Sequence, residues 1–178
     1  MPTYISLLRG INVSGQKKIL MVDLKSLYEE LGFTNVQTYI QSGNVAFEYK
    51  KTTPIKLQKM ILDKINNHYG FEVPNLILAP KEIEEALDNN PYQHIEKPYF
   101  TFLSEFPKQE NIDALNSISF DNEFFELIAK VIYSHYPNGV GRAKMTLNFF
   151  EKKLKVNATA RNLNTTKKLL EMAKFTTD

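Results

Sequence analysis

The sequence predicts an α+β protein made of two tandem units, each with the element order β-α-β-β-α-β. Three observations lead to this fold class. Short apolar runs alternate with stretches of helical apolar spacing, glycines end the helical stretches, and the order recurs after an acidic segment. This order is the ferredoxin-like unit, also called a split β-α-β unit or α-β plait. The predicted division is 1–79 for the first unit, 80–97 for a helical acidic connector, and 98–178 for the second unit with a C-terminal helix.

In the first unit, apolar residues at helical spacing precede Gly32 and Gly70, and glycine favours the left-handed conformation that ends a helix. Alternating or continuous apolar runs mark the strands. The expected strands are residues 4–9, 36–40, 45–49 and 76–78, and the expected helices are residues 21–31 and 55–69.

The acidic connector is expected to be helical over 80–90, between Pro80 and Pro91. Its spacing predicts that three acidic side chains face solvent and two apolar ones are covered: Glu82, Glu85 and Asp88, and Ile83 and Leu87. In the second unit we expect strands at 99–103, 124–129, 131–135 and 154–158, and helices at 111–117, 143–153 and 165–175.

Composition restricts the class of protein. Hydrophobic residues make up 43% of the 178 residues, which is enough for a packed core, and no cysteine is present for a disulfide or a thiolate zinc site. No basic leader and no apolar run of about 20 residues is present, so we expect a cytoplasmic protein that does not enter the membrane. The three histidines show no metal-ligand spacing. We therefore expect no metal and no cofactor.

Charge is distributed unevenly along the chain. Residues 81–127 carry 3 basic and 11 acidic side chains, whereas residues 139–178 carry 9 basic and 3 acidic ones. A basic segment favours an anionic partner. Alternatively, the acidic and basic stretches face each other or are simply solvated.

A first candidate ligand site lies where two loops of the first unit converge. In a split β-α-β unit, the loop after strand one and the turn after strand two emerge at one end of the sheet. Glycine exposes backbone N–H groups there, close to a helix N-terminus, and guanidinium and amide side chains accompany them. The candidate residues are Arg9, Gly10, Asn12, Gln41, Ser42, Gly43 and Asn44. Alternatively, Arg9 and Asn12 brace the loop and Gly43 only forms a tight turn.

A second candidate site follows from the same topology in the second unit. Two segments that each precede a helix would emerge together there, and cations at helix starts oppose the helix dipole unless an anion binds. We expect Arg142 and Arg161 to share one concave surface. The candidate residues are Arg142, Lys144, Arg161 and Asn162. Alternatively, Arg161 pairs with the acidic middle segment.

Several motifs are close to known patterns without matching them. Gly10 to Lys17 approaches a phosphate-binding P-loop, but Gln16 separates Gly15 from Lys17 and no Ser or Thr follows. Ser42 has no evident histidine partner for nucleophilic catalysis. The strand after Asn44 lacks the aromatic pattern of an RNA-recognition sheet.

Three motifs together are specific for one family: Leu7-Leu8-Arg9-Gly10-Ile11-Asn12-Val13, Thr38-Tyr39-Ile40-Gln41-Ser42-Gly43-Asn44-Val45 and Ala158-Thr159-Ala160-Arg161-Asn162-x-Asn164-Thr165. With them the chain resembles the bacterial domain-of-unknown-function family 1697. The resemblance implies two ferredoxin-like halves, and it implies no established activity or catalytic residue. Ser14 stands where that family commonly has glycine, and Leu163 where it commonly has tryptophan.

Two functions follow from these observations. The first is binding of, or catalysis on, a phosphate- or carboxylate-bearing ligand, including a nucleotide or nucleic acid. The alternative is a protein–protein interaction module with no small-molecule site.

Overall fold

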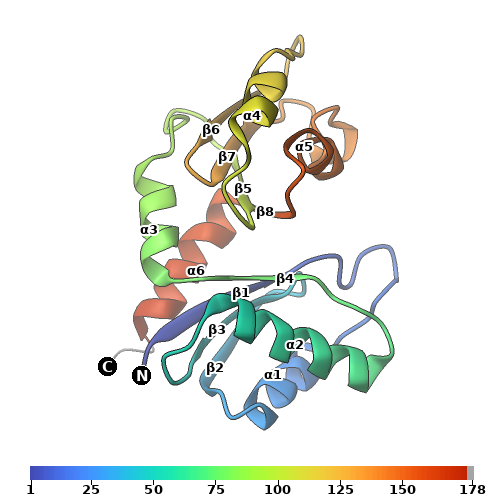
Figure 1. Ribbon diagram of the computed structural model, residues 1–178, viewed down its shortest axis with the longest axis vertical. Helices are drawn as coiled ribbons and strands as arrows, with labels where there is room; N and C mark the ends of the chain where they lie inside the picture. Colours follow the sequence, from blue (N-terminus) through green and yellow to red (C-terminus); the bar gives the residue numbers. More distant parts are fainter. Residues whose placement is uncertain (176–178) are drawn as a thin grey trace. The chain divides into compact units, whose positions relative to one another are not determined.

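The structure is a computed structural model that describes residues 1–175 of the 178-residue chain (Figure 1). The chain divides into two compact units. The first comprises residues 1–85 and the described residues from Lys167 onward, and the second comprises residues 86–166. Compactness therefore places residues 80–85 and the end of the C-terminal helix with the first unit. The last three residues of the predicted second unit lie outside the described part of the chain.

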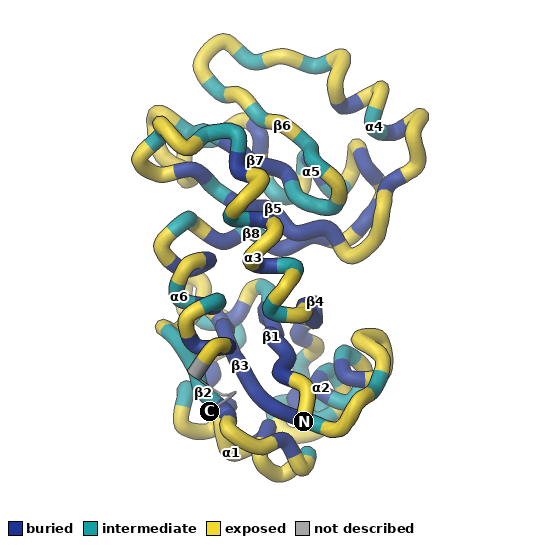
Figure 2. Tube along the Cα trace, turned by 90° about the vertical axis from the view of Figure 1, so that its left-hand side faces the viewer, coloured by how far each residue is buried: buried dark blue, intermediate teal, exposed yellow. Residues whose placement is uncertain are grey.

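The first unit contains a four-stranded antiparallel sheet in the order β2-β3-β1-β4. The two central strands, β1 and β3, are buried along their whole length (Figure 2). Its elements are β1 (Thr3–Leu8), α1 (Met21–Glu30), β2 (Thr34–Tyr39), β3 (Asn44–Glu48), α2 (Pro54–Tyr69) and β4 (Asn75–Leu78).

Helices α1 and α2 cover one face of this sheet (Figure 1). Tyr28 of α1 and Ile61 of α2 are buried with Phe47 of β3 in one apolar cluster. The hydroxyls of Ser6 and Tyr28 form a buried hydrogen bond of 2.8 Å, and burial raises the pKa of Tyr28 well above its usual range. The loops at the ends of these elements are therefore attached to a packed core.

The second unit contains a second four-stranded antiparallel sheet, in the order β6-β7-β5-β8. Leu115 of α4 and Phe150 of α5 are buried in a cluster with Leu103 and Ile132 of the sheet, so both helices pack on one face. The elements are β5 (Tyr99–Leu103), α4 (Gln109–Asn116), β6 (Phe124–Ile128), β7 (Val131–His135), the 3-10 turn η1 (Val140–Arg142), α5 (Leu147–Leu154) and β8 (Ala158–Asn162).

The largest differences from the sequence prediction in the second unit are at α5 and β8. Helix α5 begins at Leu147 and not at residue 143, because the Thr146 hydroxyl caps it by accepting a hydrogen bond of 3.1 Å from Phe149 N. The last strand lies at 158–162 and not at 154–158. Leu154 is still helical, and Lys155 ends the helix with a left-handed φ of 56°.

Two helices, α3 (Pro80–Asp88) and α6 (Leu163–Phe175), contribute residues to both units. In α3, Ile83 is buried as predicted, whereas Leu87 is only half-buried. Glu82 is half-buried rather than exposed, because its carboxylate accepts a hydrogen bond of 2.8 Å from Ala79 N at the helix start. Within the first unit, Lys174 Nζ of α6 lies 3.8 Å from a carboxylate oxygen of Glu84. No helix among the described residues is long and apolar enough to cross a bilayer.

Candidate functional site

The loop after β1 and the turn between β2 and β3 meet at one edge of the first sheet. Leu8 N donates a hydrogen bond of 2.8 Å to Gly43 O, and Gly10 follows two residues later. Gly43 has a φ of 87°, and a Cβ added there would lie 2.5 Å from Leu8 Cβ. Because real Cβ atoms do not approach so closely, only glycine fits this crossing of the two loops.

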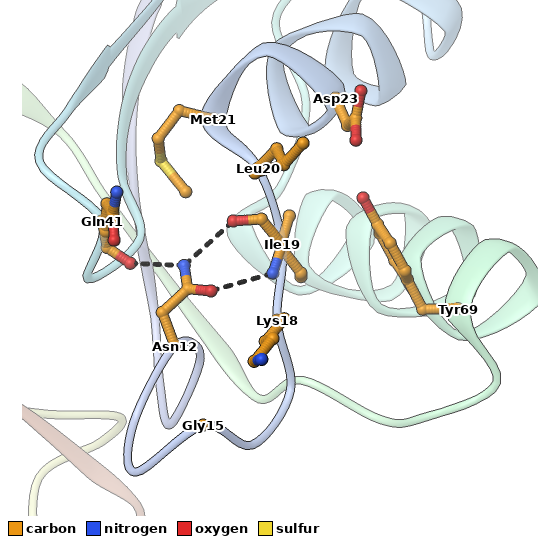
Figure 3. Close-up of a pocket in the computed structure, with 9 residues that line it drawn as sticks. All are labelled: Asn12, Gly15, Lys18, Ile19, Leu20, Met21, Asp23, Gln41 and Tyr69. Carbon is orange, nitrogen blue, oxygen red and sulfur yellow. Dashed lines mark hydrogen bonds between the residues drawn. The ribbon is translucent and has the colours of Figure 1, made fainter.

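Asn12 fixes the first loop to its surroundings through three hydrogen bonds (Figure 3). Its Oδ1 accepts from Ile19 N at 2.9 Å, and its Nδ2 donates to Ile19 O at 3.0 Å and to Gln41 O at 2.8 Å. Both Nδ2 donors are therefore used by the chain itself. Asn12 braces the site, which was the alternative to a role as a ligand-reading amide.

Asn44 has a similar bracing role in the second loop. Its side chain is fully buried, and its Nδ2 donates to Tyr39 O at 3.0 Å and to Ser42 Oγ at 2.9 Å. Arg9 is half-buried at the end of β1, where its backbone N–H donates to Pro74 O at 2.9 Å. Of the seven residues predicted for this site, Asn12, Gly43 and Asn44 thus hold the two loops together.

Residues 12–17 form a small exposed hairpin. Ser14 and Gly15 have left-handed φ values of 51° and 73°, and Gln16 N donates to Val13 O at 2.9 Å across the turn. Asn12 N donates to Lys17 O at 3.1 Å and closes the hairpin. The Lys17 ammonium donates to Glu72 O at 2.7 Å, so its position is fixed as well.

A pocket of about 400 Å³ lies between this hairpin, the start of α1, and the end of α2 (Figure 3). Its polar groups are the Lys18 ammonium, the Asp23 carboxylate, the Gln41 amide and the Tyr69 hydroxyl, and its apolar wall comes from Ile19, Leu20 and Met21. The lining residues are Asn12, Gly15, Lys18, Ile19, Leu20, Met21, Asp23, Gln41 and Tyr69.

Helix α1 begins at this pocket without a side-chain cap. Its N-cap residue is Leu20, which has no hydrogen-bonding side chain, and the helix itself starts at Met21. Among the described residues, the first-turn N–H groups of Met21, Val22 and Asp23 have no acceptor. Lys18 and Asp23 both line the pocket without an ion pair to any described residue. A helix start with unsatisfied N–H groups and a lysine therefore line the same pocket.

Tyr69 forms the wall of the pocket on the side of α2. Its hydroxyl oxygen is buried and has no hydrogen-bond partner among the described residues. Burial, and to a smaller extent the negative charge of Asp23, raise the pKa of Tyr69 above its ordinary value. An unpaired buried hydroxyl destabilises the folded state, so this wall is not optimised for stability alone.

Backbone N–H groups near the second predicted site form hydrogen bonds to a side chain of the protein. The Glu123 carboxylate accepts hydrogen bonds from Lys144 N at 2.8 Å and from Met145 N at 2.8 Å, just before the start of α5. At the next helix start, Asn162 Oδ1 accepts from Thr165 N at 2.8 Å. Backbone groups that were expected to bind an anion are thus satisfied within the chain.

Arg161 lies in β8 rather than in a loop, which corrects its predicted place. Only 8% of its surface is exposed, and its guanidinium donates to Thr159 Oγ1 at 3.0 Å and to Ala160 O at 2.8 Å. Burial lowers the pKa of Arg161 to about 10, so the side chain stays charged at neutral pH. Arg142 is exposed in η1. The Arg161 guanidinium is thus buried and that of Arg142 exposed, and their shared concave surface stays a prediction.

The sequence interpretation missed most of the pocket lining. Lys18 was visible as half of a basic pair, but Leu20, Met21 and Asp23 looked like ordinary residues at a helix start. Tyr69 gave no sequence signal, because it reaches the pocket only through the packing of α2 beside α1. No group of three or more metal-ligating side chains is found among the described residues.

Comparison with known proteins gives the family. The sequence profile described as "Protein of unknown function (DUF1697)" matches residues 1–133. The chain belongs to the DUF1697 family. The matched residues include the pocket and both of its loops, whereas the third motif, at 158–165, lies beyond them.

A solved structure supports the fold of the whole chain. "The structure of conserved bacterial protein SP0830 from Streptococcus pneumoniae" is similar with a TM-score of 0.73 and 22% identity. The similarity covers 97% of this chain and 98% of that chain. At this identity the similarity establishes the fold alone. Among curated proteins, none matches this chain.

Proposed function

We propose that the chain binds a small anionic ligand, with a phosphate or carboxylate group, in the pocket at the start of α1. One observation carries the proposal: three uncapped N–H groups of a helix start and an unpaired Lys18 lie beside the same pocket. Helix N-termini favour anions because unpaired N–H groups and the helix dipole act together. The Gln41 amide adds a neutral donor and acceptor at the rim.

The bracing residues support this assignment. Asn12 and Gly43 hold the hairpin, the β2–β3 turn and the residue before α1 in one arrangement. A pocket whose walls are fixed in advance loses less entropy when a ligand binds. The second cluster, around Arg142 and Arg161, stays a prediction. We do not place the ligand there, because the Glu123 carboxylate already accepts hydrogen bonds from the backbone N–H groups of Lys144 and Met145.

The proposal is tested by removing the Lys18 charge. Binding of inorganic phosphate, acetate and AMP is measured by calorimetry and by thermal shift. A ligand at 100 times its dissociation constant adds about 2.7 kcal/mol of stability. Lys18→Gln is expected to weaken binding of the best of these probes about ten-fold, because a charge-assisted hydrogen bond is lost. Added salt should weaken wild-type binding as well.

Lys25→Gln is the matched control, since Lys25 is exposed on α1 and does not line the pocket. It removes the same charge and should leave the affinity within about two-fold. Equal effects of the two variants, or no binding of any probe, would contradict the proposal.

A second candidate function is a protein-interaction module. Four exposed aliphatic side chains occur on the segments that border the pocket: Val13 at 58%, Leu20 at 67%, Val22 at 68% and Ile40 at 50% exposure. Exposed apolar patches often mark protein interfaces. A partner that binds by this surface should tolerate high salt, whereas an anionic ligand should not.

We also propose that each unit is ferredoxin-like and that the protein is bacterial and cytoplasmic. The strand orders β2-β3-β1-β4 and β6-β7-β5-β8 support the first assignment, because in each an inner strand separates the two strands joined through the first helix. The lack of cysteine fits a reducing compartment. Solving the crystal structure and locating the tagged protein by cell fractionation would test these assignments.

A further inference from the structure

Helix α1 begins with a residue type that is unfavourable in two respects at that position. Leu20 is its N-cap, and leucine is among the residues least favoured there because it cannot accept a hydrogen bond from the helix start. The same side chain is 67% exposed, and Val22 in the first turn is 68% exposed. Places where a sequence breaks local rules are often functional sites.

Other helix starts in the chain show the usual solution. Thr53 caps α2 and Thr146 caps α5, each with a hydrogen bond from the helix to its hydroxyl. Helix α4 also begins without a cap, but its N-cap Lys108 is a polar, solvated residue. The exposed leucine at the open start of α1 thus has no counterpart at the starts of α2, α4 and α5.

The pocket beside Leu20 combines one cation with an apolar wall. Leu20 and Met21 line it at the helix start, Lys18 lines it on the side of the hairpin, and the ring of Tyr69 stands opposite on α2 (Figure 3). The Asp23 carboxylate also lines the pocket. The negative charge of Asp23 repels a doubly charged ligand more than a singly charged one. It therefore disfavours phosphate esters relative to carboxylic acids.

We propose that the ligand is a monoanionic carboxylic acid with an apolar body. Its carboxylate binds at the first turn of α1, in the pocket that Lys18 also lines, and its apolar body lies against Leu20, Met21 and the ring of Tyr69. This inference rests on the proposed anion pocket and adds what the acid group is attached to. In this arrangement Leu20 contributes ligand-binding surface at the position where a capping residue would have stabilised the helix.

The test uses a series of acids that differ only in chain length. Binding of acetate, hexanoate and octanoate is measured by calorimetry, with 1-octanol and inorganic phosphate as comparison probes. Affinity should rise about four-fold for each methylene that becomes buried. Octanoate should bind more tightly than both 1-octanol and phosphate. In Asp23→Asn, affinity for phosphate should rise more than affinity for octanoate.

Leu20→Ser separates ligand contact from folding. Serine is a good N-cap, so this variant should melt at the same temperature as wild type or higher. It should nevertheless lose the increase in affinity from hexanoate to octanoate. Ile55→Ser is the matched control, because Ile55 is 77% exposed on α2 and lies outside the pocket lining. It should keep the full dependence on chain length. Wild-type binding of octanoate by Leu20→Ser would overturn the proposal.

The outcomes distinguish this inference from the proposed anion pocket on which it rests. If phosphate or acetate binding needs Lys18 but the affinity for the acids does not depend on chain length, the proposed apolar body of the ligand is wrong. The proposed anion pocket then still holds. Absence of Lys18-dependent binding of every acid and of phosphate overturns both. Binding of 1-octanol as tight as that of octanoate overturns the role of the carboxylate.

Discussion

The side chain of Asn12 and the backbone of Ile19 form a reciprocal pair of hydrogen bonds, 2.9 Å from Ile19 N to Asn12 Oδ1 and 3.0 Å from Asn12 Nδ2 to Ile19 O. The pair connects the loop after β1 to the residue before the N-cap of α1. A third bond, to Gln41 O, connects both to the β2–β3 turn. One amide thus sets the positions of three segments that border the pocket.

Removing this amide should loosen the loop without backbone strain. Asn12 has a φ of 55°, which glycine also adopts readily, so Asn12→Gly deletes the hydrogen bonds without backbone strain, and glycine adds freedom to the unfolded chain. We expect a loss of about 1–2 kcal/mol in the free energy of unfolding in urea, because the bonds are only partly buried. The variant should also bind any pocket ligand more weakly. A change below about 0.5 kcal/mol would show that the loop holds its shape by other means.

Gly43→Ala should be among the most damaging small substitutions in the first unit. The new Cβ would combine a left-handed φ of 87° with a contact of 2.5 Å to Leu8 Cβ. We expect a loss of about 2–4 kcal/mol, measured by urea denaturation. Gly10→Ala is the matched control: its φ is 74°, but nothing lies within 4 Å of the added Cβ. It should cost about 1–2 kcal/mol, and equal losses would contradict the steric explanation.

Tyr69→Phe should not destabilise the protein, although Tyr69 lies in a packed wall. Its buried hydroxyl has no partner, so removing it also removes a desolvation cost, and we expect no change or a gain of up to about 1 kcal/mol. Tyr28→Phe is the comparison. There the hydroxyl bonds to Ser6 Oγ at 2.8 Å, and its removal should cost about 1–2 kcal/mol. Thermal denaturation of both variants measures these changes in stability. A clear loss of stability in Tyr69→Phe would contradict the expectation and reveal a partner for its hydroxyl.

Stability should fall in alkaline solution before the polypeptide is damaged. Burial raises the pKa values of Tyr133 and Tyr136 from 10.0 to about 12 each. Between these values the folded protein keeps phenolic protons that the unfolded chain releases, so stability is full below pH 10 and is lost as pH rises toward 12. Arg161, whose pKa is lowered to about 10, acts in the opposite direction as a single group.

The measurement is the free energy of unfolding between pH 9 and pH 12, together with tyrosinate absorbance. Tyr133→Phe removes one of these raised pKa values and should make the decline of the free energy of unfolding shallower. A wild-type free energy that stays flat through this window would contradict the assignment.

Sheet order and loop convergence could be predicted because they depend on patterns that the sequence displays directly. Alternating apolar residues and helix-ending glycines gave the element order, and chain connectivity then placed Gly10 near Gly43. The roles of Asn12 and Asn44 could not be predicted in this way. An amide in a glycine-rich loop can read a ligand or brace the backbone equally well, and only the positions of its partners decide between them.

Other features could not be predicted because a single residue or a contact between distant residues determines them. The run from Leu154 to Ala158 looked like a strand, but the left-handed turn at Lys155 shifts the strand to 158–162 and takes Arg161 into it. Glu123 lies twenty-one residues before Lys144, so no local pattern could show that its carboxylate accepts a hydrogen bond from Lys144 N. The pocket itself depends on the side-by-side packing of α1 and α2, which spacing along the chain does not reveal.

The division of the first unit into two chain segments has a consequence for the order in which the units fold. That unit combines residues 1–85 with residues from Lys167 onward, while residues 86–166 form one uninterrupted stretch. During translation, residues 86–166 leave the ribosome before Lys167 does. The second unit can therefore reach its compact state while the first still waits for the segment that includes the buried Leu169 and Met172. Domains made on the ribosome usually fold from the N-terminal one onward, and this chain is expected to finish in the reverse order.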